Sequence, residues 1–369
     1  MSTLAIRAAR GALTLSMLLG SPAVAAAPQP PVATMTSQWT HDTTVPTQNE
    51  EVGISIDRYI HAAEKSPAKI THDAMYVQRI FSEGRPDTAS AGSVLLPGQE
   101  TGLTTLMPRG VTSLYKFPKA LVFYVQSGEG TLDDGKLFWD LHEGSVLFVP
   151  PNLAHRFRAT AAAPLKMIMF SYNPGEGWPL RKDILVRDSN QMLMYQRNVH
   201  WAHNSKRAFD PSDGTGGVVA LVITFAPMSA AGAHVDALNP APYKTPTQWI
   251  HVTDGKMLIQ LGDEIRRWPI NTGFVNPANG QTVHNRINLS PTVETMLYLG
   301  GPGNPNPPPR PVTALPGRPL GMGAMGQTWK PEEIGGLQGN VINPEVTESY
   351  VSSIVAGRPL PASAGGAAR

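Results

Sequence analysis

Short runs of apolar and β-branched residues, each closed by Gly, Asn, Asp or Pro, fill the middle of this 369-residue chain. The clearest are LVFYVQSGEG, GSVLFVPPNLAHRF, VVALVITFAPM, WIHVTDGKMLIQLG and TVETMLYLGG. Runs of this length and composition predict short β-strands joined by tight turns. Short helices are expected over residues 54–63, 331–334 and 344–354. The pattern as a whole predicts an all-β sandwich or barrel.

The strand pattern occurs twice. Gly128 precedes His155 by 27 positions, and Gly255 precedes His284 by 29 positions. In each half, a strand that ends in Gly leads to a second Gly, then to Pro, and then to Asn and His. Two copies of one β unit are the simplest explanation of this periodicity.

The first residues are typical of a cleaved secretory signal. Arg7 and Arg10 precede an apolar stretch, residues 11–20, and the small residues of 23–25 follow it. A membrane anchor is the alternative, but the apolar stretch is well short of the roughly 20 residues that span a bilayer. Residues 1–25 are therefore predicted to be a signal peptide, and the mature protein is expected in a periplasm or outside the cell, without membrane contact.

The two ends of the chain lack apolar periodicity. Residues 26–50 are rich in Pro, Ala and Thr and predict a flexible leader. Residues 303–369 begin with a segment rich in Pro and Gly, and they predict either a solvated tail or an arm that wraps over a neighbour.

Composition narrows the range of functions. The chain has no Cys, so no disulfide or thiolate metal site is available and any metal must be held by nitrogen and oxygen. The net charge of +2 is small, and no cluster of Lys and Arg forms a basic stripe, which argues against nucleic acid as a partner. Charged residues make up 16%, whereas about 25% is typical of soluble domains, and Gly and Pro number 35 each. This composition favours short strands and turns over long helices.

The segments VFYVQSGEGTL and LHEGSVLFVPPNLAHRF resemble the two characteristic motifs of the cupin superfamily. In the first half the matching positions are Gly144, Pro150 and His155, with Asn152 where Gly is usual. In the second half they are Gly273, Pro277 and His284, with one extra residue before Gly280. The resemblance implies two cupin-type jelly-roll β-barrels in tandem, over residues 51–180 and 181–302, with N- and C-terminal extensions.

Cupins normally hold a metal with His-x-His, a following Glu and a later His, because residues i and i+2 of a strand face the same side. In the first unit the resemblance places Tyr115 and Phe117 at the His-x-His positions and Leu121 at the Glu position. His155 alone cannot hold a catalytic metal. Tyr115, Phe117 and His155 are candidates for a substrate-binding pocket, although packing in the core explains them equally well.

In the second unit the resemblance places Gln248, seven residues before Gly255, at the Glu position. The His-x-His pattern is met only if His234-x-Asp236 is the counterpart and residues 237–246 are an insertion. The predicted metal ligands are then His234, Asp236, Gln248 and His284. Two His and one carboxylate favour Fe(II), and Mn, Ni, Cu or Zn remain alternatives. The other interpretation is that His234 and Asp236 lie in an ordinary surface loop.

The resemblance is to bicupins of the quercetinase type, which implies a metal-dependent dioxygenase acting on a phenolic or enolic small molecule. Asp236 is the expected proton acceptor. Trp249 and Trp268 are candidates for packing an aromatic substrate, although Trp residues on strands more often pack in the core. The alternatives are a non-catalytic bicupin that binds a small molecule or carbohydrate, and a metal-dependent lyase or isomerase. A homo-oligomer is expected by analogy alone.

Overall fold

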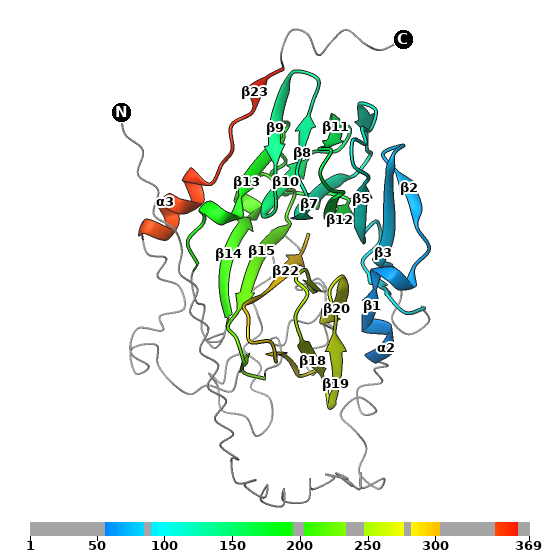
Figure 1. Cartoon of the computed structure of the whole chain (residues 1–369), viewed down its shortest axis with the longest axis vertical. Helices are drawn as coiled ribbons and strands as arrows, with labels where there is room; N and C mark the ends of the chain where they lie inside the picture. Colours follow the sequence, from blue (N-terminus) through cyan, green and yellow to red (C-terminus); the bar gives the residue numbers. More distant parts are fainter. Residues whose placement is uncertain are drawn as a thin grey trace, which may run out of the picture. The chain divides into compact units, whose positions relative to one another are not determined.

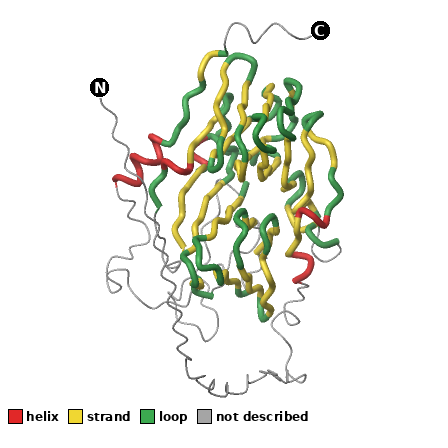
Figure 2. The backbone as a smooth tube through the Cα atoms, in the orientation of Figure 1, coloured by secondary structure: helices red, strands yellow, loops and turns green. Residues whose placement is uncertain are grey.

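The structure is a computed structural model that describes residues 56–84, 90–194, 203–233, 247–276, 282–302 and 344–360. All of these residues belong to one unit, which extends from Pro46 to Arg369. Strands and loops make up nearly all of the described residues (Figure 2), so the predicted all-β fold is confirmed. Among the described residues, no helix has the length and apolar character that a membrane crossing requires.

The first barrel consists of a large and a small sheet (Figure 1). The large sheet has the order β13-β10-β7-β12-β5-β3-β2, with β4 paired to β3. Its strands are β2 (Lys69–Thr71), β3 (Met75–Glu83), β4 (Ser93–Leu95), β5 (Glu100–Leu106), β7 (Ala120–Ser127), β10 (Ser145–Val149), β12 (Leu165–Tyr172) and β13 (Leu185–Asp188). The small sheet has the order β23-β9-β8-β11-β6, built from β6 (Tyr115–Lys116), β8 (Gly130–Asp133), β9 (Leu137–Leu141), β11 (Ala154–Ala159) and β23 (Arg358–Pro359).

The second barrel repeats this plan. Its large sheet has the order β1-β20-β17-β22-β15-β14, built from β1 (Ile60–Ala62), β14 (His203–Phe209), β15 (Val219–Phe225), β17 (Thr247–His251), β20 (Thr272–Asn276) and β22 (Glu294–Gly300). Its small sheet has the order β16-β21-β18-β19, built from β16 (Ser229–Ala230), β18 (Met257–Leu261), β19 (Glu264–Trp268) and β21 (His284–Asn288). Strands β17, β20 and β22 take the places of β7, β10 and β12. The repeated strand pattern in the sequence thus corresponds to a repeated strand order in the structure.

Strand β1 joins the second barrel although it comes from the start of the described chain. It pairs with β20, at the place that β13 occupies beside β10 in the first barrel. Short helical segments lie around the strands: α2 (Ile56–Tyr59), η1 (Ala63–Lys65), η2 (Ser189–Gln191), η3 (Pro211–Asp213) and α3 (Pro344–Ser352). The predicted helices over 54–63 and 344–354 thus have counterparts in α2 and α3, and residues 331–334 lie outside the described residues.

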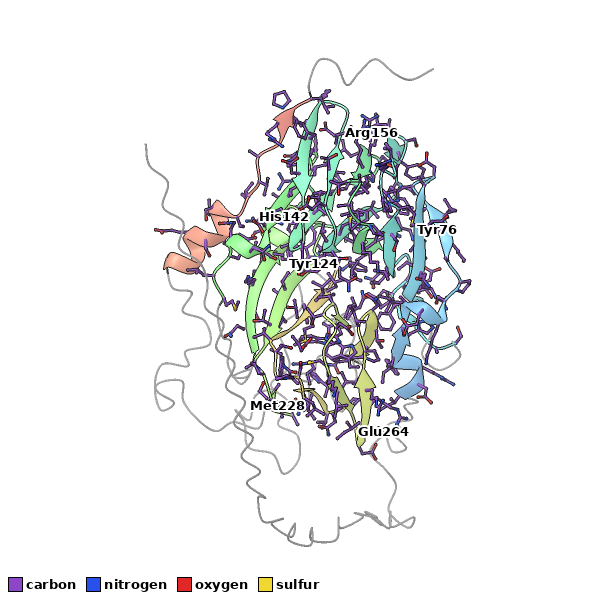
Figure 3. All side chains as sticks on the ribbon, viewed as in Figure 1. Tyr76, Tyr124, His142, Arg156, Met228 and Glu264 are labelled. Atoms are coloured by element: carbon purple, nitrogen blue, oxygen red, sulfur yellow. The ribbon has the colours of Figure 1, made fainter. Side chains whose placement is uncertain are left out.

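One apolar core joins the two large sheets. Phe170 and Tyr172 of the first barrel and Ile250 and Leu297 of the second belong to the same cluster of buried residues. Tyr124, labelled in Figure 3, lies in this cluster too. Each large side chain buried in such a layer contributes about 1.5–3 kcal/mol to folding. The two barrels therefore share a core, in addition to the separate one that fills the interior of the first barrel.

Two Gln side chains cross the layer between the barrels. Gln126 Nε2 donates to the carbonyl of Val252 (2.9 Å) and to Asn271 Oδ1 (2.8 Å). In the other direction, Thr101 Oγ1 donates to Gln248 Oε1 (2.5 Å). These bonds satisfy polar groups that would otherwise be costly to bury, and they fix one sheet against the other.

The described part of the C-terminal arm packs on the first barrel of the same chain. The N–H groups of Asp188 and Val355 donate to the carbonyls of Ser353 and Val186, so the segment after α3 extends the β13 edge. Arg187 stacks on the Tyr350 ring at 3.8 Å. Farther along, β23 pairs with β9.

Replacing Gly128 with Ala is expected to destabilise the protein more than replacing Gly135 with Ala. Both residues have left-handed φ angles, 84° and 87°, so a Cβ costs about 1–2 kcal/mol at either position. At Gly128 the new Cβ would also lie 2.2 Å from the carbonyl oxygen of Pro164, whereas at Gly135 the nearest atom, in Leu114, is 3.4 Å away.

We expect Gly128→Ala to lower the free energy of unfolding by about 1–3 kcal/mol more than Gly135→Ala, because the backbone cannot yield easily. Urea denaturation of both variants measures this difference. Equal losses would contradict the steric explanation for the first glycine of the motif.

Candidate functional site

Strand β17 presents alternate side chains to the interior of the second barrel. The Arg286 guanidinium lies 4.0 Å from the centre of the Trp249 ring. Phe274 stacks parallel to Trp249 with ring centres 6.0 Å apart, and Tyr298 meets Trp249 edge-on at 4.8 Å. Side chains of the same chain thus cover the faces of the Trp249 ring, and this ring packs against the Arg286 guanidinium.

His284 lies on the same face of β21 as Arg286, because residues two apart on a strand point to the same side. Both side chains have no exposed surface. In the first barrel, β11 corresponds to β21, and its pair at the same spacing is His155 and Phe157. The second barrel therefore carries a cation where the first carries an aromatic ring.

The structure does not bring Gln248 together with His284. Gln248 adjoins Trp249 on β17, so it points to the opposite face of the sheet, where it accepts a hydrogen bond from Thr101 of the first barrel. Counting back from Gly255 gave the wrong face because the connection after β17 spans residues 252–256, whereas only residues 128 and 129 follow β7. A change of one residue in register exchanges the two faces of a strand.

Trp268 lies inside the second barrel, away from solvent. Its indole N–H donates to the carbonyl of Thr272 (2.6 Å), and its ring packs edge-on against Phe274 at 5.0 Å. These contacts account for its burial, as the packing interpretation of this residue expects.

The other two predicted metal ligands, His234 and Asp236, lie outside the described residues. Within the described ranges, no group of three His, Cys, Asp or Glu side chains is arranged to hold a metal. Of the two predicted ligands that the structure describes, His284 lies inside the second barrel and Gln248 does not.

Sequence reasoning missed a buried carboxylate at the other end of the second barrel. Glu294 accepts hydrogen bonds from Thr253 Oγ1 (2.5 Å) and Thr292 Oγ1 (2.9 Å), and His251 Nε2 lies 3.3 Å away. Burial raises the pKa of Glu294, but the hydrogen bonds outweigh it and hold the pKa below its ordinary value. The only signal in the sequence was an acidic residue inside the apolar run TVETMLYLGG.

The Glu294 cluster also explains the second motif glycine. A Cβ on Gly255 would lie 1.8 Å from a Glu294 carboxylate oxygen. Gly128 has a different reason, since its Cβ would meet backbone. The two repeat glycines therefore occupy similar places for different steric reasons.

The first barrel buries a second histidine that the sequence motifs did not indicate. His72, in the turn between β2 and β3, bonds to His155 through their Nε2 atoms (2.9 Å). Its ring is stacked on Phe117, with ring centres 5.6 Å apart and an interplanar angle of 6°, and lies 5.1 Å from Tyr115. Three predicted substrate-binding residues, Tyr115, Phe117 and His155, thus surround a side chain of the same protein.

The hydrogen bonds fix the tautomers of the histidine pair. His155 Nδ1 lies 2.9 Å from the Leu153 carbonyl, which can only accept, so the proton of neutral His155 is on Nδ1. His155 Nε2 then accepts from His72 Nε2–H, and His72 Nδ1 accepts from the Thr71 hydroxyl (3.0 Å). Burial, together with the neighbouring His155, lowers the pKa of His72 to about 3. Burial also lowers the pKa of His155.

The buried pair should make the protein sensitive to acid. Below pH 6.5 the unfolded chain binds a proton at His72, whereas the folded chain binds it only near pH 3, so the free energy of unfolding falls as the pH falls through this range. The slope from one such group is at most about 1.4 kcal/mol per pH unit.

Urea denaturation between pH 7 and pH 4.5 should show a smaller slope for His72→Phe than for the wild type. The Phe ring keeps the stacking and removes the titrating group. An unchanged slope would mean that His72 is not buried in its neutral form.

Comparison with known proteins supports the fold. The model of the Cupin domain family matches residues 102–171. A search of curated proteins found no match. Among solved structures, the putative glyoxylate induced protein from Pseudomonas aeruginosa has a TM-score of 0.50 and 15% identity, over 65% of this chain and 86% of that one.

Two further structures are similar at lower identity. AerE from Microcystis aeruginosa has a TM-score of 0.49 and 11% identity, over 66% of this chain and 98% of its own. Vicilin from Corylus avellana has a TM-score of 0.48 and 11% identity, over 66% of this chain and 85% of its own. The Cupin domain model thus falls within the first barrel, and the second barrel repeats the strand order of that barrel.

Proposed function

We propose that this cupin works through its second barrel, which binds a small molecule carrying an anionic group such as a phenolate or enolate. The observation that carries the proposal is the fully buried Arg286, stacked on Trp249 and on the same strand face as His284. The first barrel has Phe157 at the corresponding position. Among the described residues, the second barrel therefore carries a buried cation where the first barrel carries an aromatic ring.

Arg286 suits an anion for physical reasons. A buried guanidinium is stabilised by opposite charge and by hydrogen bonds, and stacking on an aromatic ring adds about 2 kcal/mol where water is excluded. The group is planar and directs five N–H bonds within its plane, so it can hold a carboxylate or phenolate oxygen while its face stays on Trp249.

The catalytic form of the proposal is a metal-dependent dioxygenase acting on a phenolic or enolic substrate. His284 fits a metal ligand, because its imidazole is buried and faces the barrel interior, and His234 and Asp236 would complete two His and one carboxylate. Gln248 does not fit, because it faces the first barrel. A bound metal, with Fe(II) favoured, would act as a Lewis acid and bring dioxygen to the substrate. Asp236 would then accept the hydroxyl proton, and Arg286 would hold the resulting oxygen anion.

A second candidate is a non-catalytic bicupin that binds its ligand without a metal. It is favoured by the orientation of Gln248, which leaves the predicted ligand set with three members. In either form, we propose that residues 1–25 direct export and are removed, so that the mature protein acts in the periplasm or outside the cell.

Arg286→Met should weaken the binding of a phenolate probe such as 4-nitrophenolate by about 10- to 100-fold, the range expected for a lost charge-assisted hydrogen bond. Arg286→Lys should lose less, because it keeps the charge. Isothermal titration measures both, and Arg266→Met, at an exposed position on β19, is the matched control. Equal affinity in the wild type and in Arg286→Met would contradict the assignment of the anion site.

The metal form is tested by elemental analysis of the mature protein, beginning near Ala26. We expect one divalent metal per chain, its loss in His284→Ala, and oxygen uptake with a phenolic substrate only in the metal-loaded protein. If the protein instead stays metal-free after reconstitution with Fe(II), Mn, Ni, Cu and Zn and still binds the phenolate through Arg286, that result would contradict the metal-dependent form of the proposal and support the non-catalytic form.

A further inference from the structure

Side chains of the first barrel enclose the imidazole ring of His72 on several sides. His72 is 1% exposed, although it belongs to a short turn at the edge of a sheet. Its imidazole makes two hydrogen bonds, to His155 and to the Thr71 hydroxyl, and several ring contacts, as a bound planar molecule would.

Aromatic rings form the walls of this site. Phe117 stacks flat on the His72 ring, and Tyr115 lies tilted beside it. Phe123 and Phe157 present their rings edge-on at 6.0 and 6.1 Å. Offset stacking and edge-on contacts are the arrangements that aromatic ligands prefer.

The polar group in this site, His155, has a defined role. Its Nδ1–H is committed to the Leu153 carbonyl, so its Nε2 is a hydrogen-bond acceptor aimed at the enclosed ring. A neutral ring with one N–H or O–H donor would satisfy this acceptor. A carboxylate would not, because it has no proton to donate.

The segment that carries His72 has few attachments. Strand β2 has three residues and lies at the edge of the large sheet. In the turn, His72 and Asp73 have left-handed φ angles of 47° and 58°, and beyond the His72 contacts the turn is held by Asp73, whose carboxylate accepts from the N–H of Ser113 (3.1 Å). A short edge hairpin of this kind can move without disturbing the barrel core.

We propose that the space around the His72 ring in the first barrel is a binding site for a small, neutral, planar molecule that donates one hydrogen bond, an azole or a phenol, and that His72 is the lid that occupies it. The site is distinct from the anion site proposed for the second barrel, since it offers an acceptor and apolar walls instead of a cation. The lid makes the wild-type site weak, because a ligand must displace the His72 ring.

Imidazole tests the site directly, because it is the ring that His72 supplies. The variant His72→Gly removes that ring, and Gly also suits the left-handed backbone at this position. We expect His72→Gly to bind imidazole at least tenfold more tightly than the wild type, measured by isothermal titration, and to regain melting temperature as imidazole is added.

The control is the double variant His72→Gly, His155→Leu, which keeps an apolar side chain at 155 but removes the acceptor. Loss of imidazole binding in this variant supports the site. Binding that survives in it, or binding that is equal in His72→Gly and the wild type, would overturn the proposal.

If His72→Gly does not fold alone, its refolding is measured with and without imidazole. Recovery of folded protein that depends on imidazole supports the site, and recovery that is the same without imidazole overturns the site. None of these readouts depends on Arg286 or on a metal.

Discussion

The central strands of both barrels are buried on both of their faces, and this constraint governs what each of their side chains can contact. Strand β7 has one face in the interior of the first barrel and the other against the second barrel, and β17 has the mirror situation. Successive residues of a strand alternate between faces. In each such strand, therefore, one set of side chains determines what its own barrel can bind, while the next set holds the two barrels together.

This constraint also explains which parts of the structure the sequence could reveal. The short strands, their turns and their repetition follow from local pattern, because turn residues and apolar runs mark them wherever they occur. The side to which Gln248 points does not follow, because a strand buried on both faces has no alternation of polar and apolar residues to mark its inner face. Counting from Gly255 then relied on a turn length that differs between the two halves.

Contacts between segments that are distant in the sequence could not be predicted either. His72 precedes the first cupin motif and meets His155 only after β2 and β3 have joined the edge of the large sheet. Strand β1 likewise completes the second barrel from the start of the described chain. The spacing of residues within a motif does not indicate such partners. His72 could therefore be identified as a site residue only once the strand order was known.

The two barrels have diverged in what they enclose. The first surrounds a neutral histidine pair with aromatic rings, and the second places a guanidinium beside a histidine on an equivalent strand. The same pair of positions, two apart on β11 and on β21, thus carries His with Phe in one barrel and His with Arg in the other. We propose that the replacement of this Phe by Arg makes the second barrel the one that binds an anionic ligand.

A crystal of the wild-type protein soaked with a brominated phenol, at a pH where the phenol is ionised, tests this claim most directly, because anomalous scattering locates bromine without bias. The account predicts bromine inside the second barrel, with the phenolate oxygen at Arg286 and the His72 ring still in place in the first. Bromine in the first barrel with His72 displaced, and none near Arg286, would contradict it.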